Sequence, residues 1–119
     1  MKKNRDDFFL KHIVMAFENV FSYINGISCE EFLCNNLIKD AVVRNFEIIG
    51  EATKNLTVEF RQSYPDIDWK GLAGYRDILI HQYFGIDYLM VWNMSQKEAR
   101  ITYNKIKVIH KNMKINFYI

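Results

Sequence analysis

Helix-breaking residues are rare in this chain, and their rarity constrains the fold more than any other sequence feature. The 119 residues include one proline and five glycines. Because these residue types end helices and open turns, a chain with so few of them has few turns and long elements. The length suits one domain, residues 1–119, with enough buried surface for a hydrophobic core.

Apolar residues recur at three- and four-residue spacing along four long segments, as they do on the buried face of a helix. The segments run from about Asp6 to Asn25, Asn36 to Asn55, Trp69 to Gln82 or Tyr83, and Tyr88 to Asn112. No segment with a period of two lies between turn signals. We therefore predict an all-α fold, an up-and-down bundle of four main helices with short helical turns in the connections.

Local signals indicate where these helices begin and approach one another. Residues that commonly cap helix N-termini precede the predicted helices, namely Ser28, Thr57, Asp68 and Asp87. Ser28 and Glu31 also have the spacing of a capping box. Gly50 lies in the middle of the second helix, where glycine costs up to about 1 kcal/mol relative to alanine. A close approach between two helices best explains it.

Several classes of protein are excluded by counts alone. The longest uncharged stretch has eleven residues, Asn19 to Cys29, whereas a membrane-spanning helix needs about 20. Charged residues near the start interrupt the apolar run that a secretory signal requires. Cys29 and Cys34 match neither a disulfide framework nor zinc-ligand spacing, so we expect reduced thiols in a cytoplasmic protein. No phosphate-binding glycine loop or metal-ligand set is present, and we expect neither a cofactor nor a metal.

Isolated ionisable residues carry weak signals. Glu47 and Glu51 lie one turn apart and could form a metal or acid–base pair. The alternative is a solvated or salt-bridged helix face, with Arg44 as the partner of Glu47. His12 and His110 stand alone on their helices and are expected to be surface or structural residues.

The end of the third predicted helix concentrates chemically versatile side chains. Arg76, His81 and Tyr83 lie within eight residues, around an Ile-Leu-Ile sequence. Arg76 and Tyr83 share one side of an ideal helix, but Arg76 and His81 are about 140° apart. Their convergence requires a distorted last turn or an arginine that reaches around the helix. A buried pair of Arg76 with Asp77 and a capping His81 are the alternatives.

This Arg-x4-His-x-Tyr pattern resembles the signature of the HepT-like branch of the HEPN superfamily. Other segments are similar to the same family in order and spacing: VRNFEIIGEA at 43–52, PDIDW at 65–69, FGID at 84–87 and VW at 91–92. Asp77 occupies a position where the family usually has asparagine or aspartate. The resemblance extends from about Asp6 to Ile109 and implies a HEPN-like helical bundle.

The resemblance implies an endoribonuclease toxin of a type VII-like toxin–antitoxin system, metal-independent and homodimeric, with two motifs facing a shared cleft. Arg76 and His81 would be catalytic and Asp77 supporting. The residue types suit the reaction, because histidine exchanges protons near neutral pH and arginine stabilises negative charge on a phosphorane-like transition state. The expected product is a 2′,3′-cyclic phosphate.

The resemblance also implies a partner. The antitoxin of such a pair is a minimal nucleotidyltransferase that transfers AMP to the motif tyrosine, here Tyr83. AMP would add bulk and negative charge beside Arg76 and His81 and would repel an RNA phosphate. Alternatively, Tyr83 is a packing residue. The whole chain could also be a non-catalytic helical partner that presents substrate to a nucleotidyltransferase.

Charge is distributed unevenly along the chain. Residues 97–114 include six basic residues and one acidic residue, a net charge of +5, while the rest of the chain has ten basic and 13 acidic residues, a net charge of −3. Lys105, Lys107 and Lys111 of this segment could bind an RNA backbone. A solvated helix face and a docking surface for an acidic antitoxin remain as alternatives.

Overall fold

The computed structural model describes residues 5–80 and 85–117. Within these ranges the chain forms seven helices and no strand, which confirms the predicted all-α class. The helices are α1 (Asp6–Ile24), α2 (Cys29–Cys34), α3 (Asn36–Lys54), α4 (Val58–Ser63), α5 (Trp69–Ile80), α6 (Tyr88–Met94) and α7 (Lys97–Phe117). Over the same ranges, none of them is long and apolar enough to cross a membrane.

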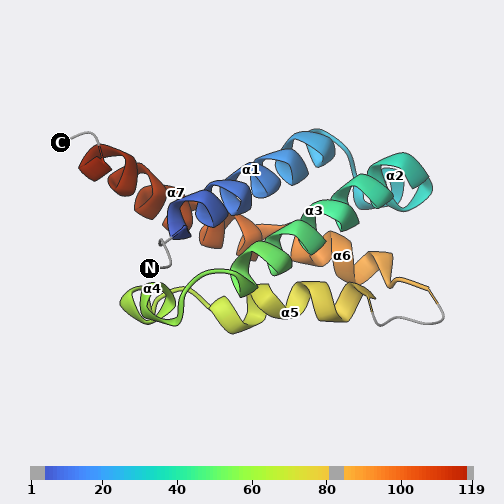
Figure 1. The fold of residues 1–119 in the computed structure, drawn as a ribbon. Helices are drawn as coiled ribbons and strands as arrows, with labels where there is room; N and C mark the ends of the chain where they lie inside the picture. The colour runs from blue at the N-terminus through green and yellow to red at the C-terminus, as the bar shows by residue number, and fades with distance from the viewer. Residues whose placement is uncertain (1–4, 81–84, 118–119) are drawn as a thin grey trace.

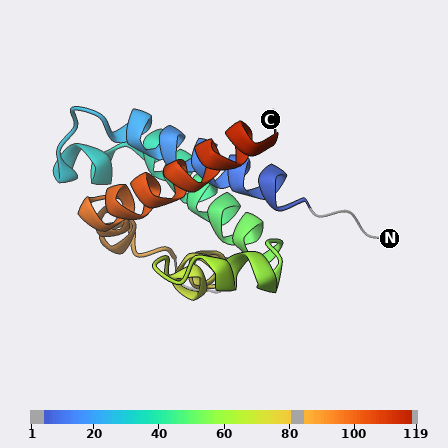
Figure 2. The same cartoon turned by 90° about the vertical axis from the view of Figure 1, so that its left-hand side faces the viewer.

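The long helices run up and down, as the sequence predicts. Figure 1 shows α1 and α3 running in opposite directions, α5 reversing direction again, and α6 and α7 returning along the bundle. The short helices α2 and α4 lie in the connections. Helix α3 packs against both α1 and α5, and α7 packs against α1 (Figure 2). Helix α3 is therefore the central element of the bundle.

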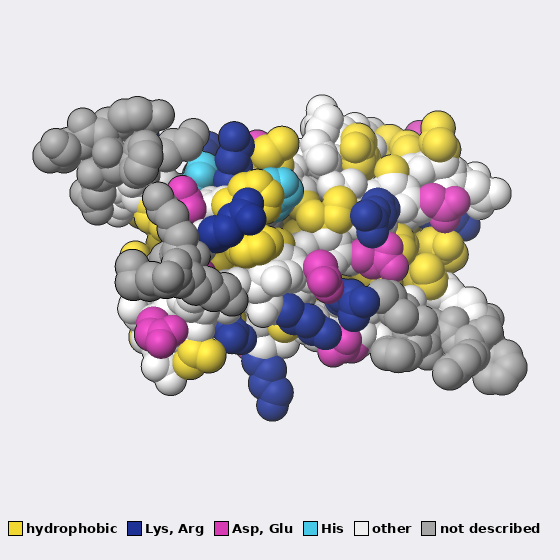
Figure 3. Space-filling view, in the orientation of Figure 1, with side chains coloured by type: hydrophobic (Ala, Val, Ile, Leu, Met, Phe, Trp, Pro, Cys, Tyr) yellow, Lys and Arg dark blue, Asp and Glu magenta, His cyan; other side chains and the backbone are white. Residues whose placement is uncertain are grey.

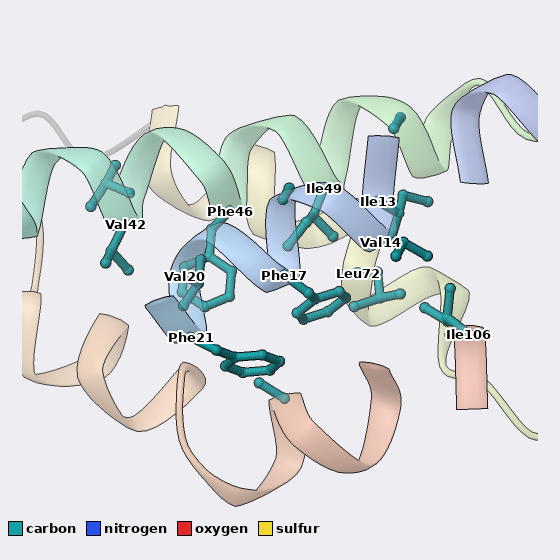
Figure 4. Close-up of a cluster of buried hydrophobic side chains, with 14 of the residues drawn as sticks. Ile13, Val14, Phe17, Val20, Phe21, Val42, Phe46, Ile49, Leu72 and Ile106 are labelled. Atoms are coloured by element: carbon teal, nitrogen blue, oxygen red, sulfur yellow. The ribbon is translucent and has the colours of Figure 1, made fainter. Parts of the chain in front are cut away.

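The core lies between α1 and α3 and is closed by side chains of the other helices. Phe17 and Val20 of α1 and Phe46 of α3 are fully buried and lie close together (Figure 4). Leu72 of α5 and Ile106 of α7 extend the cluster. Removal of this apolar surface from water is the main force that holds the helices together.

The predicted capping residues act as caps. The Ser28 hydroxyl accepts from the Glu31 amide at 3.1 Å, and the Glu31 carboxylate accepts from the Ser28 amide at 2.9 Å, a complete capping box. Three more side chains accept hydrogen bonds from amides in the first turns that follow them: Thr57, Asp68 and Asp87. Cys29 and Cys34 are free thiols.

The predicted single helix from Tyr88 to Asn112 is wrong, because the chain turns at Ser95 and Gln96. Helix α6 ends at Met94, and α7 begins at Lys97 and continues to Phe117. Ser95 is fully buried, and its hydroxyl donates to the Trp92 carbonyl. Serine competes in this way with the helical hydrogen bonds of the backbone.

The start of α1 is tied to a distant part of the chain. Asp6 is buried, and its carboxylate accepts from the amide of Thr57 at 2.8 Å and from the Thr57 hydroxyl at 2.7 Å. Thr57 is also the N-cap of α4. One pair of side chains therefore joins the N-termini of two helices.

Candidate functional site

Helices α3 and α5 come into backbone contact where Gly50 meets Arg76. A Cβ atom on Gly50 would lie 2.7 Å from the backbone nitrogen of Arg76 and 2.8 Å from its Cβ. Both separations are shorter than van der Waals contact, so only glycine permits this approach. The close helix approach predicted at Gly50 is confirmed, and its partner is the arginine of the motif.

Two residues of α3 hold two consecutive residues of α5. The Arg76 Nε donates to Glu51 Oε2 at 2.8 Å, and the Lys54 Nζ donates to Asp77 Oδ1 at 2.7 Å. The Arg76 side chain is 38% exposed, so it remains accessible to a solute. Each pair is partly solvated and contributes at most about 1 kcal/mol. Their main effect is to fix side-chain orientation.

The Arg76 and Asp77 side chains do not form the buried pair considered from the sequence. Their nearest charged atoms are 4.0 Å apart, and the Asp77 side chain is 53% exposed. The salt-bridged face suggested for Glu47 and Glu51 is confirmed, with Arg44 as the partner of Glu47 at 3.9 Å and Arg76 as the partner of Glu51.

Arg76 borders a groove of about 390 Å³ between α1, α3 and α5, which we name the Arg76 groove. Its charged and aromatic lining includes Phe8, His12, Arg44, Glu47, Glu51 and Arg76. Figure 3 shows the corresponding face, where basic and acidic side chains gather over α3 and α5 beside hydrophobic side chains and the one histidine of α1.

Three planar side chains are in contact at the start of α1, and two of them, Phe8 and His12, line the Arg76 groove. The Arg5 guanidinium carbon lies 4.4 Å from the Phe8 ring centroid, and the centroids of the Phe8 and His12 rings are also 4.4 Å apart. His12 is exposed, as expected, but its position in the same groove as Arg76 was not predicted. Helical periodicity identifies the face on which a residue lies, but not the element across from it.

Tyr75 anchors the chain next to Arg76. Its ring packs edge-on against Phe46 with 5.3 Å between centroids. Burial raises the pKa of the Tyr75 hydroxyl above its usual value of 10, and the charges of Asp68 and Glu98 raise it further. Tyr75 is therefore neutral near pH 7 and serves as a packing residue.

Two predicted site residues, His81 and Tyr83, lie outside the described residues. Helix α5 carries the motif as far as Ile80. Among the side chains that the structure does describe, no group of three or more His, Cys, Asp or Glu residues could hold a metal ion.

The structure separates the three lysines predicted to bind RNA. Lys107 and Lys111 line a second groove of about 340 Å³ between α1 and α7, together with Lys11, and we name it the lysine groove. Lys105 instead donates to the backbone carbonyl of Asp66 at 3.3 Å.

A hydrogen bond fixes α7 against α1 near the lysine groove. The Tyr103 hydroxyl donates to Glu18 at 2.7 Å. Desolvation and this contact raise the pKa of Tyr103 to about 12. The bond therefore persists at neutral pH and holds the two walls of the groove together.

Comparisons with known proteins match most of the chain. The model of the family described as "Ribonuclease HepT-like" matches residues 13–109, which include Arg76 and His81. "Putative RNase TTE0752" of Caldanaerobacter subterraneus subsp. tengcongensis is 42% identical over 85% of this chain and 90% of that protein. "Putative RNase MJ1216" of Methanocaldococcus jannaschii is 47% identical over 76% and 74%. "Probable ribonuclease HepT" of Thermococcus cleftensis is 36% identical over 93% and 100%. No solved structure matches the chain significantly.

Proposed function

Because this chain belongs to the HepT-like ribonuclease family, we propose that it is an RNA-cleaving toxin that needs no metal ion. The observation that carries the proposal is the position of Arg76. Its guanidinium is anchored through Nε by Glu51 at the edge of an open groove, while the side chain stays accessible. The planar terminal nitrogens of arginine match the oxygens of a phosphate.

The proposed reaction is an attack by the ribose 2′-hydroxyl on the adjacent phosphate. His81 takes the proton of the 2′-hydroxyl, and the new bond between O2′ and phosphorus forms as the bond to the 5′-oxygen breaks. A proton returns to that leaving oxygen. The products are a 2′,3′-cyclic phosphate and a 5′-hydroxyl. Arg76 stabilises the negative charge that grows on the phosphate, and Asp77 supports it.

The proposed toxin is a homodimer, and an antitoxin inactivates it. One His81 per chain supplies one proton carrier, and a two-fold dimer supplies two. A minimal nucleotidyltransferase transfers AMP to Tyr83 and inactivates the toxin, because the added phosphate repels RNA from Arg76. The toxin acts in the cytoplasm, where RNA and this partner are present.

The test is cleavage of single-stranded RNA by purified protein in excess EDTA. We expect cleavage with a 2′,3′-cyclic phosphate end, detected by mass spectrometry of the fragments. Arg76→Ala and His81→Ala should each lower the rate at least about 100-fold, the usual contribution of one acid–base or charge-stabilising group. Arg100→Ala is the matched control, because Arg100 is an exposed arginine that does not line the Arg76 groove.

Coexpression with a nucleotidyltransferase tests whether AMP transfer to Tyr83 inactivates the protein. Intact-mass and peptide spectra should show AMP on Tyr83 and loss of RNA cleavage, and Tyr83→Phe should remain active and unmodified. Equal RNA cleavage by wild type, Arg76→Ala and His81→Ala would show that the catalytic assignment is wrong. A wild-type protein that leaves RNA intact yet copurifies with the nucleotidyltransferase would instead be a non-catalytic partner.

A further inference from the structure

We propose that the Arg76 groove binds a nucleobase of the RNA strand, stacked on the aromatic side chains of α1 beside the reacting phosphate. This inference rests on the proposed function and adds a substrate subsite to it. The residues that form the subsite are Phe8 and His12, with Arg44 at the rim of the groove.

Exposed rings on α1 give the groove an aromatic wall. The Phe8 side chain is 42% exposed, although most large apolar side chains of α1 are buried. Phe8 and His12 are one helical turn apart, so both rings project from the same side of α1. Aromatic rings bind the faces of single-stranded bases in many RNA-binding proteins. A base on Phe8 would take the place of the Arg5 guanidinium, which lies 4.4 Å from the ring centroid.

The orientation of His12 is fixed by its own helix. The His12 Nδ1 lies 2.9 Å from the carbonyl oxygen of Phe8. A carbonyl can only accept a hydrogen bond, so Nδ1 carries the hydrogen and Nε2 is the acceptor in the neutral ring. The imidazole therefore has an acceptor of fixed direction at Nε2, which suits the amino group of a base stacked on the neighbouring Phe8 ring.

The charges of the groove favour a neutral flat ring inside and a phosphate at the rim. The two carboxylates are paired with arginines, Glu47 with Arg44 at 3.9 Å and Glu51 with Arg76 at 2.8 Å. The interior is therefore close to neutral. Arg44 is 71% exposed at its side chain and can neutralise a phosphate that follows the base.

The size and position of the Arg76 groove suit a nucleobase. The volume of about 390 Å³ falls in the range of small-ligand clefts, roughly 300–1,000 Å³. Since Arg76 borders the same groove, a base bound there would place its own phosphate within reach of Arg76. The groove would then select which nucleotide lies next to the cleaved bond.

The test compares Phe8→Ala with wild type in two measurements. The first is the KM and kcat of RNA cleavage, and the second is the Kd of a 2′-O-methyl RNA, which lacks the attacking hydroxyl and cannot be cleaved. Loss of one stacking contact should raise KM and Kd about 10-fold and leave kcat within about twofold. Phe8→Trp should restore wild-type values, because the indole ring stacks at least as well.

Tyr23→Ala is the matched control, since Tyr23 is an aromatic residue of α1 that is 39% exposed and does not line the groove. It should leave both KM and Kd unchanged. Removing single bases from the RNA gives a second control. At the base that occupies the groove, an abasic site should weaken wild-type binding about 10-fold and weaken binding by Phe8→Ala no further.

The possible outcomes test the base-binding subsite and the nuclease activity separately. Cleavage with a KM and Kd that do not depend on Phe8 would overturn the subsite and leave the proposed function intact. Phe8-dependent binding of 2′-O-methyl RNA without any cleavage of ordinary RNA would retain the subsite and reject the nuclease. Wild type that neither binds nor cleaves RNA would reject both. A Phe8→Ala protein that changes its oligomeric state in gel filtration would assign this surface to a second copy of the chain.

Discussion

At the scale of single residues, Arg76 takes its orientation from a carboxylate on another helix. The Glu51 contact fixes the Nε edge of the guanidinium at 2.8 Å. The motif pattern names Arg76 and Asp77 as candidate site residues. Spacing within one helix could suggest only local partners such as Arg44 for Glu47, whereas Glu51 meets Arg76 because two helices cross at Gly50.

Removing the Glu51 carboxylate should slow RNA cleavage with little change in the free energy of unfolding. We expect Glu51→Ala to lower kcat for RNA cleavage about 10-fold, because the guanidinium loses its fixed direction. The free energy of unfolding should fall by no more than about 1 kcal/mol, since the pair is partly solvated. Glu51→Gln keeps an acceptor for Nε and should recover most of the rate. Steady-state kinetics and urea unfolding check both values, and equal rates in all three proteins would contradict the positioning role.

At the scale of helices, capping residues made most boundaries predictable. Ser28, Thr57, Asp68 and Asp87 begin helices as predicted, because each local sequence forms its own hydrogen bonds. The break at Ser95 was not predicted, because the apolar spacing continues across it. Ser95 and Glu98 do repeat the spacing of Ser28 and Glu31. That spacing does not identify the start of α7, because Ser95 is the C-cap of α6 and its hydroxyl donates to the Trp92 carbonyl.

The contact between α3 and α5 can be tested with two glycine substitutions. Gly50→Ala places a Cβ 2.7 Å from the backbone nitrogen of Arg76, so α5 must shift. Overpacking costs about 1–3 kcal/mol, and alanine returns up to about 1 kcal/mol in helix propensity. We therefore expect the free energy of unfolding to fall by about 1–2 kcal/mol and RNA cleavage to decrease.

Gly74→Ala is the control for this prediction. A Cβ on Gly74 has no neighbour within 4 Å, and the residue lies inside α5. Its substitution should raise the free energy of unfolding by up to about 1 kcal/mol, through helix propensity alone, without loss of activity. Urea unfolding followed by circular dichroism measures both variants. A Gly50→Ala protein as stable and active as Gly74→Ala would show that the close approach is unimportant.

At the scale of the whole molecule, the structure shows where the lysines of the basic C-terminal segment lie. The sequence identified a basic segment but could not say which of its lysines share a surface, because that depends on how α7 turns against α1. Lys107 and Lys111 face the lysine groove with Lys11, and Lys105 lies against Asp66. If RNA follows this surface, only some of the predicted lysines contribute to its binding.

The salt dependence of RNA binding distinguishes these lysines. Each phosphate contact on a single strand contributes about 0.7 to the slope of log K against log salt concentration. The double substitution Lys107→Ala with Lys111→Ala should lower the magnitude of that slope by about 1.4. Lys105→Ala should change it much less. Fluorescence anisotropy over a salt series measures the slope, and an unchanged slope in the double variant would leave the lysine groove without a role in RNA binding.

The contact between buried Asp6 and half-buried Thr57 has a consequence for local unfolding. The amide of Thr57 donates to a carboxylate in the first turn of α1, so its hydrogen is exposed to solvent only when that contact opens. The exchange of this one amide with deuterium therefore reports whether α1 and α4 are joined. Fraying of the first turn of α1 and loosening of the segment that leads into the motif helix should occur as one event.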